Sequence, residues 1–309
     1  MTSTLPAIEL EGLTKRFGSQ AAVDDLSARI PAGKVTGFIG PNGAGKTTTM
    51  GMLLGLVAPT AGGGRVLGAP LDNPGAFLPR VGALVEGPAF WPGLSGSENL
   101  RSLAVLGGHD VSRVATTLEM VGLGERGGDR YGIYSLGMKQ RLGIAAALLG
   151  DPELLVLDEP VNGLDPTGIT EMRRLMAALA GEGRTVLVSS HLLSELEQIA
   201  DWLLVIDRGR AVYQGPAAEL ATGAQISVQL LPASVTDFDK LLEVVAAEGH
   251  EPRRQGELVV VAANGDEPRL VSAALNRAAA DAGIVLSEVR VDRPNLESYY
   301  LAMVEGGDK

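Results

Sequence analysis

The stretch at residues 40–47 constrains this chain more than any other part of its sequence. It reads Gly40-Pro41-Asn42-Gly43-Ala44-Gly45-Lys46-Thr47, after an apolar run at 35–39 and before a run that can form a helix. Strand, G-x-x-x-x-G-K-[ST] and helix in this order are the pattern of a phosphate-binding loop. Its glycines let backbone N–H groups converge on phosphates, and the helix N-terminus adds partial positive charge. We expect the whole loop and Thr48 to bind ATP, with Lys46 on the outer phosphates and the Thr47 hydroxyl on Mg²⁺.

A second apolar run, at 154–157, ends in Asp158 and Glu159. An uninterrupted apolar run is typical of a strand buried on both faces. Two adjacent carboxylates at its end point in different directions, so we expect Asp158 to hold Mg²⁺ and Glu159 to polarise the attacking water. His191 follows a further strand at 185–188, and its neutral imidazole could bind the γ-phosphate. The alternative for the two acids is a turn after a buried strand, and the preceding phosphate loop favours a functional role for them. The alternative for His191 is a structural histidine; a functional role is favoured because the chain has only three histidines and this one follows Glu159 by 32 positions.

The rest of residues 1–221 alternates between strands and helices. Strands are expected at 7–10, 35–39, 154–157, 185–188 and 202–206, and helices at 47–57, 168–180 and 192–199. Such alternation predicts an α/β fold with a parallel sheet and crossover helices. Between about 88 and 150 the strand signal fades and helices are expected at 96–106, 111–121 and 138–149. This stretch is therefore expected to be a helical insertion.

A boundary falls at Thr222-Gly223, where the pattern is interrupted. Beyond it, in residues 222–309, the pattern predicts strands at 226–231, 257–262 and 285–291, and helices at 237–247, 267–282 and 296–304. We expect a small C-terminal α+β appendage with its own core.

Composition excludes some classes of function. The chain has 309 residues and a net charge of −11, and an acidic surface repels phosphate backbones, so nucleic acid is not expected as a partner. The first ten residues lack the basic start and apolar run of a signal peptide. The longest uncharged stretch, 47–64, holds Pro59 and three consecutive glycines, so it is not expected to span a membrane. Any membrane role is expected to come through a partner.

The sequence Ser135-Leu136-Gly137-Met138-Lys139-Gln140-Arg141, which lies between the loop and the acidic pair, resembles the signature motif of ABC-type ATPases. Asn162-Gly163-Leu164-Asp165 resembles the D-loop of the same family, and Phe17 stands where an aromatic stacks on adenine. The resemblance implies a P-loop NTPase core of ABC type, ATP and Mg²⁺ as cofactors, and two subunits packed head to tail. Each ATP would then lie between Lys46 of one subunit and Ser135 and Gly137 of the other, with Asp165 close by.

The signature and the phrase Gly82-Ala83-Leu84-Val85-Glu86 resemble the bacitracin- and antibiotic-export branch, as does the C-terminal appendage. That resemblance implies an ATP-hydrolysing subunit that powers a separately encoded membrane permease. It would act as a homodimer, or with a close paralogue, in the cytoplasm at the inner face of the cell membrane. The alternatives are a nucleotide-gated regulatory protein, or a soluble ABC ATPase that is not coupled to transport.

Two residues depart from the family pattern. Leu136 replaces the first glycine of the signature, while Ser135 and Gly137 remain. Glu86 stands where the family carries a glutamine that contacts Mg²⁺ and the attacking water; we expect it to ligate Mg²⁺, although it adds negative charge near the phosphates. Nearby, Phe90 and Trp91 are either buried in the helical insertion or exposed as contacts for the permease.

Overall fold

The computed structural model describes residues 5–191, 196, 198–222, 226–263 and 267–292. The chain forms two compact units, Met1–Ala217 and Ala218–Lys309. The helix expected at 192–199 falls mostly outside the described residues, and the helix expected at 296–304 falls entirely outside them.

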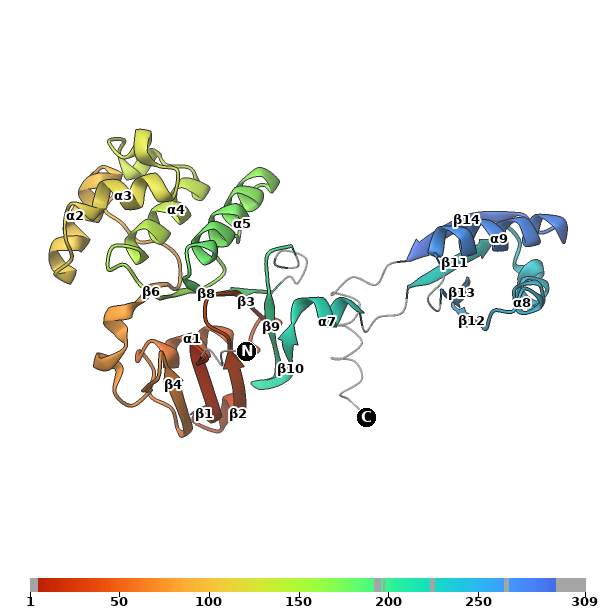
Figure 1. Ribbon diagram of the computed structural model, residues 1–309, viewed down its shortest axis with the longest axis horizontal. Coiled ribbons are helices and arrows are strands. Elements are labelled where there is room, and N and C mark those ends of the chain that lie inside the picture. Colours follow the sequence, from red (N-terminus) through yellow and green to blue (C-terminus); the bar gives the residue numbers. More distant parts are fainter. Residues whose placement is uncertain (1–4, 192–195, 197, 223–225, 264–266, 293–309) are drawn as a thin grey trace. The chain divides into compact units, whose positions relative to one another are not determined.

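The first unit contains two sheets (Figure 1). One sheet has the strand order β2-β1-β4-β5, formed by Gln20–Ile30, Ile8–Phe17, Ala61–Val66 and Ala69–Pro70. The other has the order β10-β9-β3-β8-β7-β6, formed by Arg210–Pro216, Trp202–Asp207, Val35–Ile39, Thr185–Ser190, Leu154–Leu157 and Val81–Leu84. In the second sheet every neighbouring pair is parallel except β9 and β10.

The central strands of the parallel sheet are buried over their whole length. Every residue of β3, β7 and β8 is buried, because structure covers both faces of the sheet. The strands expected at 35–39 and 154–157 are confirmed with the same bounds, and the strand expected at 185–188 extends to Ser190. The parallel α/β architecture expected from the alternating pattern is therefore confirmed.

Helix α1 (Lys46–Leu53) follows β3 directly, and α5 (Pro166–Gly181) follows β7. Helix α1 was expected to continue to residue 57. It ends earlier because Gly55 has a φ of 68°, a left-handed conformation that a helix cannot contain.

The helical insertion lies between β6 and β7 in the sequence. It comprises α2 (Gly96–Gly107), α3 (Arg113–Met120) and α4 (Leu136–Ala147), with two short 3₁₀ turns at Gly124–Arg126 and Tyr131–Ile133 between α3 and α4. Helix α2 begins with a capping box, in which the Ser95 hydroxyl accepts the Glu98 N–H while the Glu98 carboxylate accepts the Ser95 N–H. The three helices group together in Figure 1, away from the sheet that contains β1, β2 and β4.

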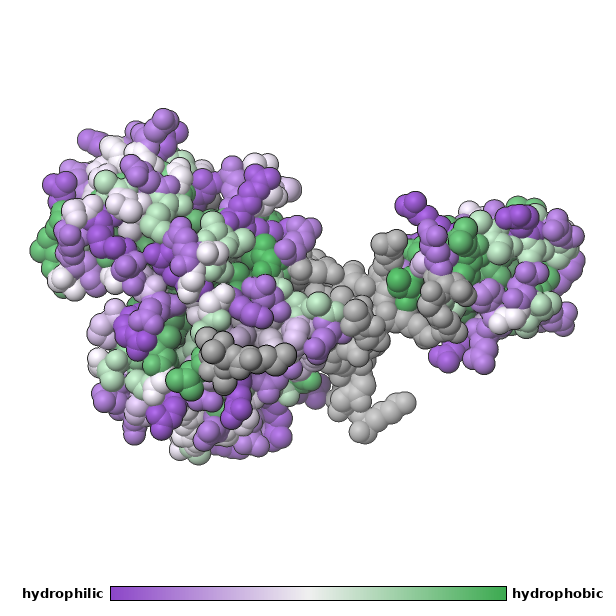
Figure 2. All heavy atoms as spheres, viewed as in Figure 1, coloured by the Kyte–Doolittle hydropathy of each residue, from purple (hydrophilic) through white to green (hydrophobic). Residues whose placement is uncertain are grey.

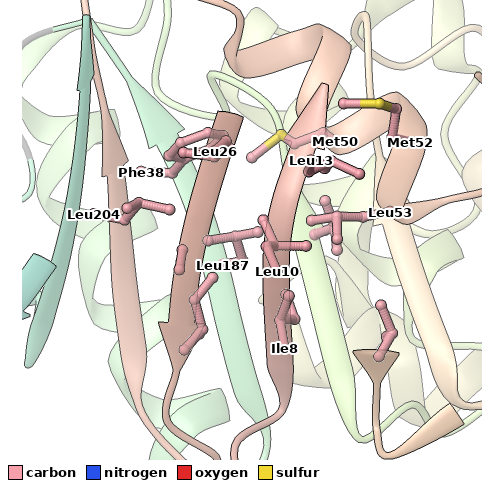
Figure 3. Close-up of a cluster of buried hydrophobic side chains, with 14 of the residues drawn as sticks. Ile8, Leu10, Leu13, Leu26, Phe38, Met50, Met52, Leu53, Leu187 and Leu204 are labelled. Atoms are coloured by element: carbon pink, nitrogen blue, oxygen red, sulfur yellow. The ribbon is translucent and has the colours of Figure 1, made fainter. Parts of the chain in front are cut away.

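The main core of the first unit lies between the antiparallel sheet, α1 and the parallel sheet. Figure 3 shows Ile8, Leu10 and Leu13 of β1 together with Met50, Met52 and Leu53 of α1. Phe38 of β3 and Leu187 of β8 belong to the same buried cluster, so the core lies directly behind the loop that joins β3 to α1.

The second unit is a four-stranded antiparallel sheet with two helices. The strand order is β12-β13-β11-β14, formed by Pro252–Gln255, Leu258–Ala262, Ser227–Pro232 and Leu286–Asp292. Helices α8 (Phe238–Ala247) and α9 (Pro268–Asp281) pack against alternate residues of the strands, among them Val228, Leu230, Val259 and Val261. This is the α+β arrangement expected for the appendage; the short helix α7 (Ala217–Thr222) precedes it.

Within the described part of the chain, no helix is long and apolar enough to cross a membrane. Hydrophilic side chains cover most of the visible face of the first unit, and hydrophobic ones are scattered between them (Figure 2).

Candidate functional site

The loop between β3 and α1 has the backbone that the glycine pattern requires. Gly45 has a φ of 104°, and a Cβ there would lie 2.4 Å from the carbonyl oxygen of Ala22. At Gly40, a Cβ would lie 2.5 Å from the carbonyl oxygen of Ile206. No side chain caps α1, so its first N–H groups face the loop and can receive an anion.

Lys46 extends back along this loop and is almost fully buried. Its Nζ donates to the carbonyl oxygen of Gly40 at 2.6 Å and to that of Pro41 at 3.4 Å. The same ammonium lies 3.4 Å from Oε1 of Glu159, and the lysine side chain is 7% exposed. The positive charge is thus held at the mouth of the loop, where an incoming phosphate would exchange with these acceptors.

Thr47 and Asp158 meet across the end of the sheet. The Thr47 hydroxyl donates to Oδ2 of Asp158 at 3.0 Å. A hydroxyl and a carboxylate oxygen are the kind of hard ligand that Mg²⁺ takes, usually together with substrate phosphates and water. These two residues therefore fit a magnesium ion. Among the described residues, no group of three histidine, cysteine or acidic side chains could hold a metal by itself.

Glu159 follows Asp158 in a left-handed conformation, with a φ of 48°. Oε2 of Glu159 lies 2.8 Å from Nδ1 of His191, and Oε1 faces Lys46. Its backbone N–H donates to Oγ of Ser189 at 2.8 Å. The carboxylate is therefore held between a histidine and a lysine at the edge of the phosphate loop. A group in this position can accept a proton from water.

Lys46, Thr47, Glu159 and His191 line a cavity of about 620 Å³. Ten residues expected at the site line it: Phe17, Pro41, Asn42, Gly43, Gly45, Lys46, Thr47, Thr48, Glu159 and His191. Gln20, Ala22 and Asn162 line it as well. Gly40, Ala44 and Asp158 do not line it; Ala44 is a buried residue of the loop. The volume falls in the range of ordinary small-molecule sites.

Phe17 lies at the outer end of this cavity. Its ring is 56% exposed, and Nζ of Lys15 lies 5.1 Å from the ring centroid. An exposed aromatic face beside a cavity is available for stacking on a planar ligand.

Ser135, Gly137 and Asp165 do not line the cavity of their own chain. The Ser135 hydroxyl caps α4 by accepting the Met138 N–H at 3.3 Å, and Asp165 caps α5 by accepting the Gly168 N–H at 3.0 Å. Ser135 and Asp165 are both exposed. The signature stretch and the D-loop nevertheless approach each other, because a Cβ at Gly163 would lie 3.0 Å from a methyl group of Leu136.

Glu86 also lies outside the set of residues that line the cavity. It is exposed and has a φ of 60°. It follows β6, whose Leu84 carbonyl accepts the Asp158 N–H at 2.8 Å, so its backbone stays near the carboxyl end of β7. Farther along, Phe90 is half-buried and packs edge-on against Tyr131, whereas Trp91 is 54% exposed.

Sequence reasoning missed Ser189, which bonds to both acidic residues. One signal could have found it: Ser189 directly follows the apolar run at 186–188 and lies two residues before His191. Asn162 had been assigned to the D-loop and not to the cavity that it lines. Gln20 and Ala22 belong to β2, a strand that sequence reasoning did not predict.

Comparisons with known proteins agree with this geometry. The pattern of the ABC transporter family matches residues 23–162. The chain is 39% identical to the bacitracin transport ATP-binding protein BcrA of Enterococcus faecalis, over 97% of both chains. It is 40% identical to the BcrA of Bacillus licheniformis, over 97% of this chain and 98% of that one. It is also 39% identical to the daunorubicin/doxorubicin resistance ATP-binding protein DrrA of Streptomyces peucetius, over 71% of this chain and 68% of that one.

Solved structures are similar to a large part of this chain. An ATP-binding subunit of an ABC transporter superimposes with a TM-score of 0.62 and 28% identity, over 70% of this chain and 92% of that one. The cbiO1 protein of Clostridium perfringens, part of an ABC transporter complex, has a TM-score of 0.65 and 23% identity, over 78% of this chain and 95% of that one. The second likeness shows the fold alone.

Proposed function

Since the chain belongs to the ATP-binding subunits of ABC transporters, we propose that its ATP hydrolysis drives a separate membrane permease that exports a peptide antibiotic or a similar antibacterial molecule. The membership rests on about 40% identity over nearly the whole chain. The export role is supported by the names of relatives that transport bacitracin or confer resistance to daunorubicin and doxorubicin.

Within this proposal, the loop from Gly40 to Thr48 holds the phosphates and Phe17 stacks on the adenine. Lys46 neutralises the outer phosphates, and Thr47 and Asp158 hold Mg²⁺, which when bound supplies positive charge to the phosphate oxygens. Glu159 accepts the proton of the attacking water, and His191 orients its carboxylate. The observation that carries these roles is the convergence of Lys46, Glu159 and His191 at one edge of the cavity.

Glu86 remains a proposed magnesium contact. Its support is the hydrogen bond from the Asp158 N–H to the carbonyl oxygen of Leu84 in β6. Glu86 follows Leu84 by two residues, so its backbone lies near Asp158. A closing motion would have to bring its exposed side chain toward the site.

We also propose that the protein acts as a head-to-tail dimer, with a second copy or a close paralogue. Ser135, Gly137 and Asp165 lie outside the cavity of their own chain, and each is left free to meet the cavity of a second subunit. Closure on ATP, and opening after hydrolysis, would then be transmitted to the permease near the exposed Trp91. Such a subunit would work at the inner face of the cell membrane.

The direct test expresses the chain together with a candidate permease in a host sensitive to antibiotics. We expect resistance to bacitracin-like peptides that disappears with Glu159→Gln, although the variant protein accumulates normally. Resistance that persists in Glu159→Gln would contradict a role for ATP hydrolysis in export. A different outcome is that neither the wild type nor the variant confers resistance, although the cells contain both this chain and the permease. That result would contradict the proposed class of cargo and leave the assignment as an ATPase intact.

A further inference from the structure

Ser189 is a polar side chain in the most deeply buried part of the sheet. It is the penultimate residue of β8, a strand in which every residue is buried, and it is 0% exposed. Strand β8 lies between β3, which leads into the phosphate loop, and β7, which ends at the two acids. Leu157 pairs with Val188, so Ser189 lies level with the start of the acidic pair.

The Ser189 hydroxyl makes two hydrogen bonds of opposite sense. It donates to Oδ1 of Asp158 at 2.6 Å, and it accepts the backbone N–H of Glu159 at 2.8 Å. A serine hydroxyl has one hydrogen to donate and can also accept. Its hydrogen goes to the Asp158 carboxylate oxygen, and its lone pair accepts the Glu159 N–H. One oxygen atom therefore contacts both residues to which the chemistry has been assigned.

For Asp158, this contact determines which oxygen faces the metal-binding position. Oδ1 is occupied by Ser189, and Oδ2 faces the hydroxyl of Thr47. Without the Ser189 hydroxyl, Oδ1 would lose its donor and the carboxylate could rotate about χ2, a broad torsion in aspartate. Oδ2 would then no longer be held toward Thr47.

For Glu159, the contact stabilises an unfavourable backbone. A glutamate at a φ of 48° is in the left-handed region, which side chains with a Cβ disfavour and which persists only where surrounding contacts fix it. The bond from its N–H to Ser189 is such a contact. This backbone directs the side chain toward Lys46 and His191.

We propose that Ser189 is a positioning residue of the ATPase site, which orients the Asp158 carboxylate for Mg²⁺ and fixes the Glu159 backbone for proton transfer. This inference rests on the roles proposed above for Asp158 and Glu159. It predicts a linked loss of magnesium affinity and turnover when the hydroxyl is removed, because one oxygen atom serves both residues.

The experiment compares three purified variants of the full chain with the wild type. Ser189→Ala removes the hydroxyl, and Ser189→Thr retains it. Thr185→Val is the matched control: Thr185 lies at the other end of β8, is buried, and its hydroxyl accepts the Gly33 N–H at 2.9 Å. The measurements are the Mg²⁺ concentration for half-maximal binding of a fluorescent ATP analogue, the turnover at saturating ATP and Mg²⁺, and the thermal midpoint.

We expect Ser189→Ala to raise the magnesium midpoint and to lower turnover, each by about 10–100-fold, the usual effect of losing a group that orients a metal ligand. Ser189→Thr should restore both within a few-fold. Thr185→Val should lower the thermal midpoint without moving the magnesium midpoint. If Ser189→Ala does not fold, Ser189→Cys replaces it in the comparison, because a thiol has a similar shape to the hydroxyl but forms weaker hydrogen bonds.

The inference is overturned if Ser189→Ala lowers only the thermal midpoint, as Thr185→Val does, because Ser189 would then have a structural role alone. A wild-type chain without magnesium-dependent hydrolysis would instead contradict the proposed function, so the two failures are distinguishable.

Discussion

The side chains of Glu159 and His191 meet at 2.8 Å between Oε2 and Nδ1, from the ends of two adjacent parallel strands. The other oxygen of Glu159 lies 3.4 Å from Nζ of Lys46. The Glu159 carboxylate is thus held between His191 and Lys46. Removing its charge should affect the chemical step far more than it affects binding.

We predict that Glu159→Gln lowers turnover by about 10²–10⁴-fold, because an amide cannot accept the proton of the attacking water. Binding of ATP should change little, since the amide keeps the shape of the side chain. Phosphate release and equilibrium binding of a fluorescent ATP analogue measure the two effects separately. Turnover at the wild-type rate would show that Glu159 is not the base.

The proposed head-to-tail dimer predicts how two defects combine in tethered dimers. With Lys46→Ala in one subunit and Ser135→Ala in the other, both defects fall in one composite site and the second site stays intact. With both changes in the same subunit, each site loses one essential residue. We therefore expect the split arrangement to hydrolyse ATP faster than the linked one. The reverse order would mean that Ser135 acts on the site of its own chain.

Ser135→Ala also removes the cap of α4, which costs about 1 kcal/mol of stability. Ser95→Ala is the matched control, since Ser95 caps α2 in the same way. If Ser95→Ala lowers turnover as much as Ser135→Ala does, the effect of Ser135→Ala comes from helix stability and not from a role at the ATP site.

For the aromatic pair before α2, we predict a division of roles. Trp91→Ala should leave the thermal midpoint and basal hydrolysis unchanged while weakening copurification with the permease, because this ring is 54% exposed. Phe90→Ala should lower stability, because its ring packs 5.2 Å from that of Tyr131; the pair itself contributes about 0.5–1.5 kcal/mol. Leu106→Ala, at an exposed residue of α2, is the control for copurification. If the Trp91 variant copurifies with the permease as well as the wild type does, Trp91 does not contribute to the permease contact.

The ion pairs of Asp151 predict a pH-dependent contribution to stability. The hydrogen bond from Arg184 lowers the pKa of the Asp151 carboxyl below its usual 3.8, Arg113 adds to this effect, and burial opposes it. A lowered folded-state pKa means that the contribution is fully present above pH 3.8 and is lost as the pH falls through the folded value. Asp151→Asn should therefore be less stable than the wild type at neutral pH, and the gap should shrink below pH 3.8.

Denaturant titrations at a series of pH values measure this gap. We expect a small effect, since 59% of the Asp151 side chain is exposed and solvent screens the pair. Asp72→Asn, at another exposed aspartate, controls for the loss of a charge. A gap between the Asp151 variant and the wild type that stays constant with pH would argue against an ionic contribution.

Sequence alone was sufficient wherever the relevant residues are neighbours in the chain. The order of strand, glycine loop, lysine and helix at 35–53 is encoded in contiguous residues, and so is the buried strand that ends in Asp158 and Glu159. Burial of β3 and β7 could be predicted because an uninterrupted apolar run suits only a strand covered on both faces. Strand β2 was missed because its apolar residues are separated by Asp24 and Asp25, and it is held by long-range pairing with β1.

What only the tertiary structure decided is which distant side chains meet. The strand order places β8 between β3 and β7, and this brings Ser189 onto Asp158 and His191 onto Glu159. The same packing keeps Ser135 and Asp165 out of the cavity that their own chain forms. No local propensity specifies these relationships, because they depend on how separate segments share one sheet and one core. The phosphate loop could therefore be identified from its residues, but the contacts of Ser189 with Asp158 and of His191 with Glu159 were decided only by the assembly of the strands.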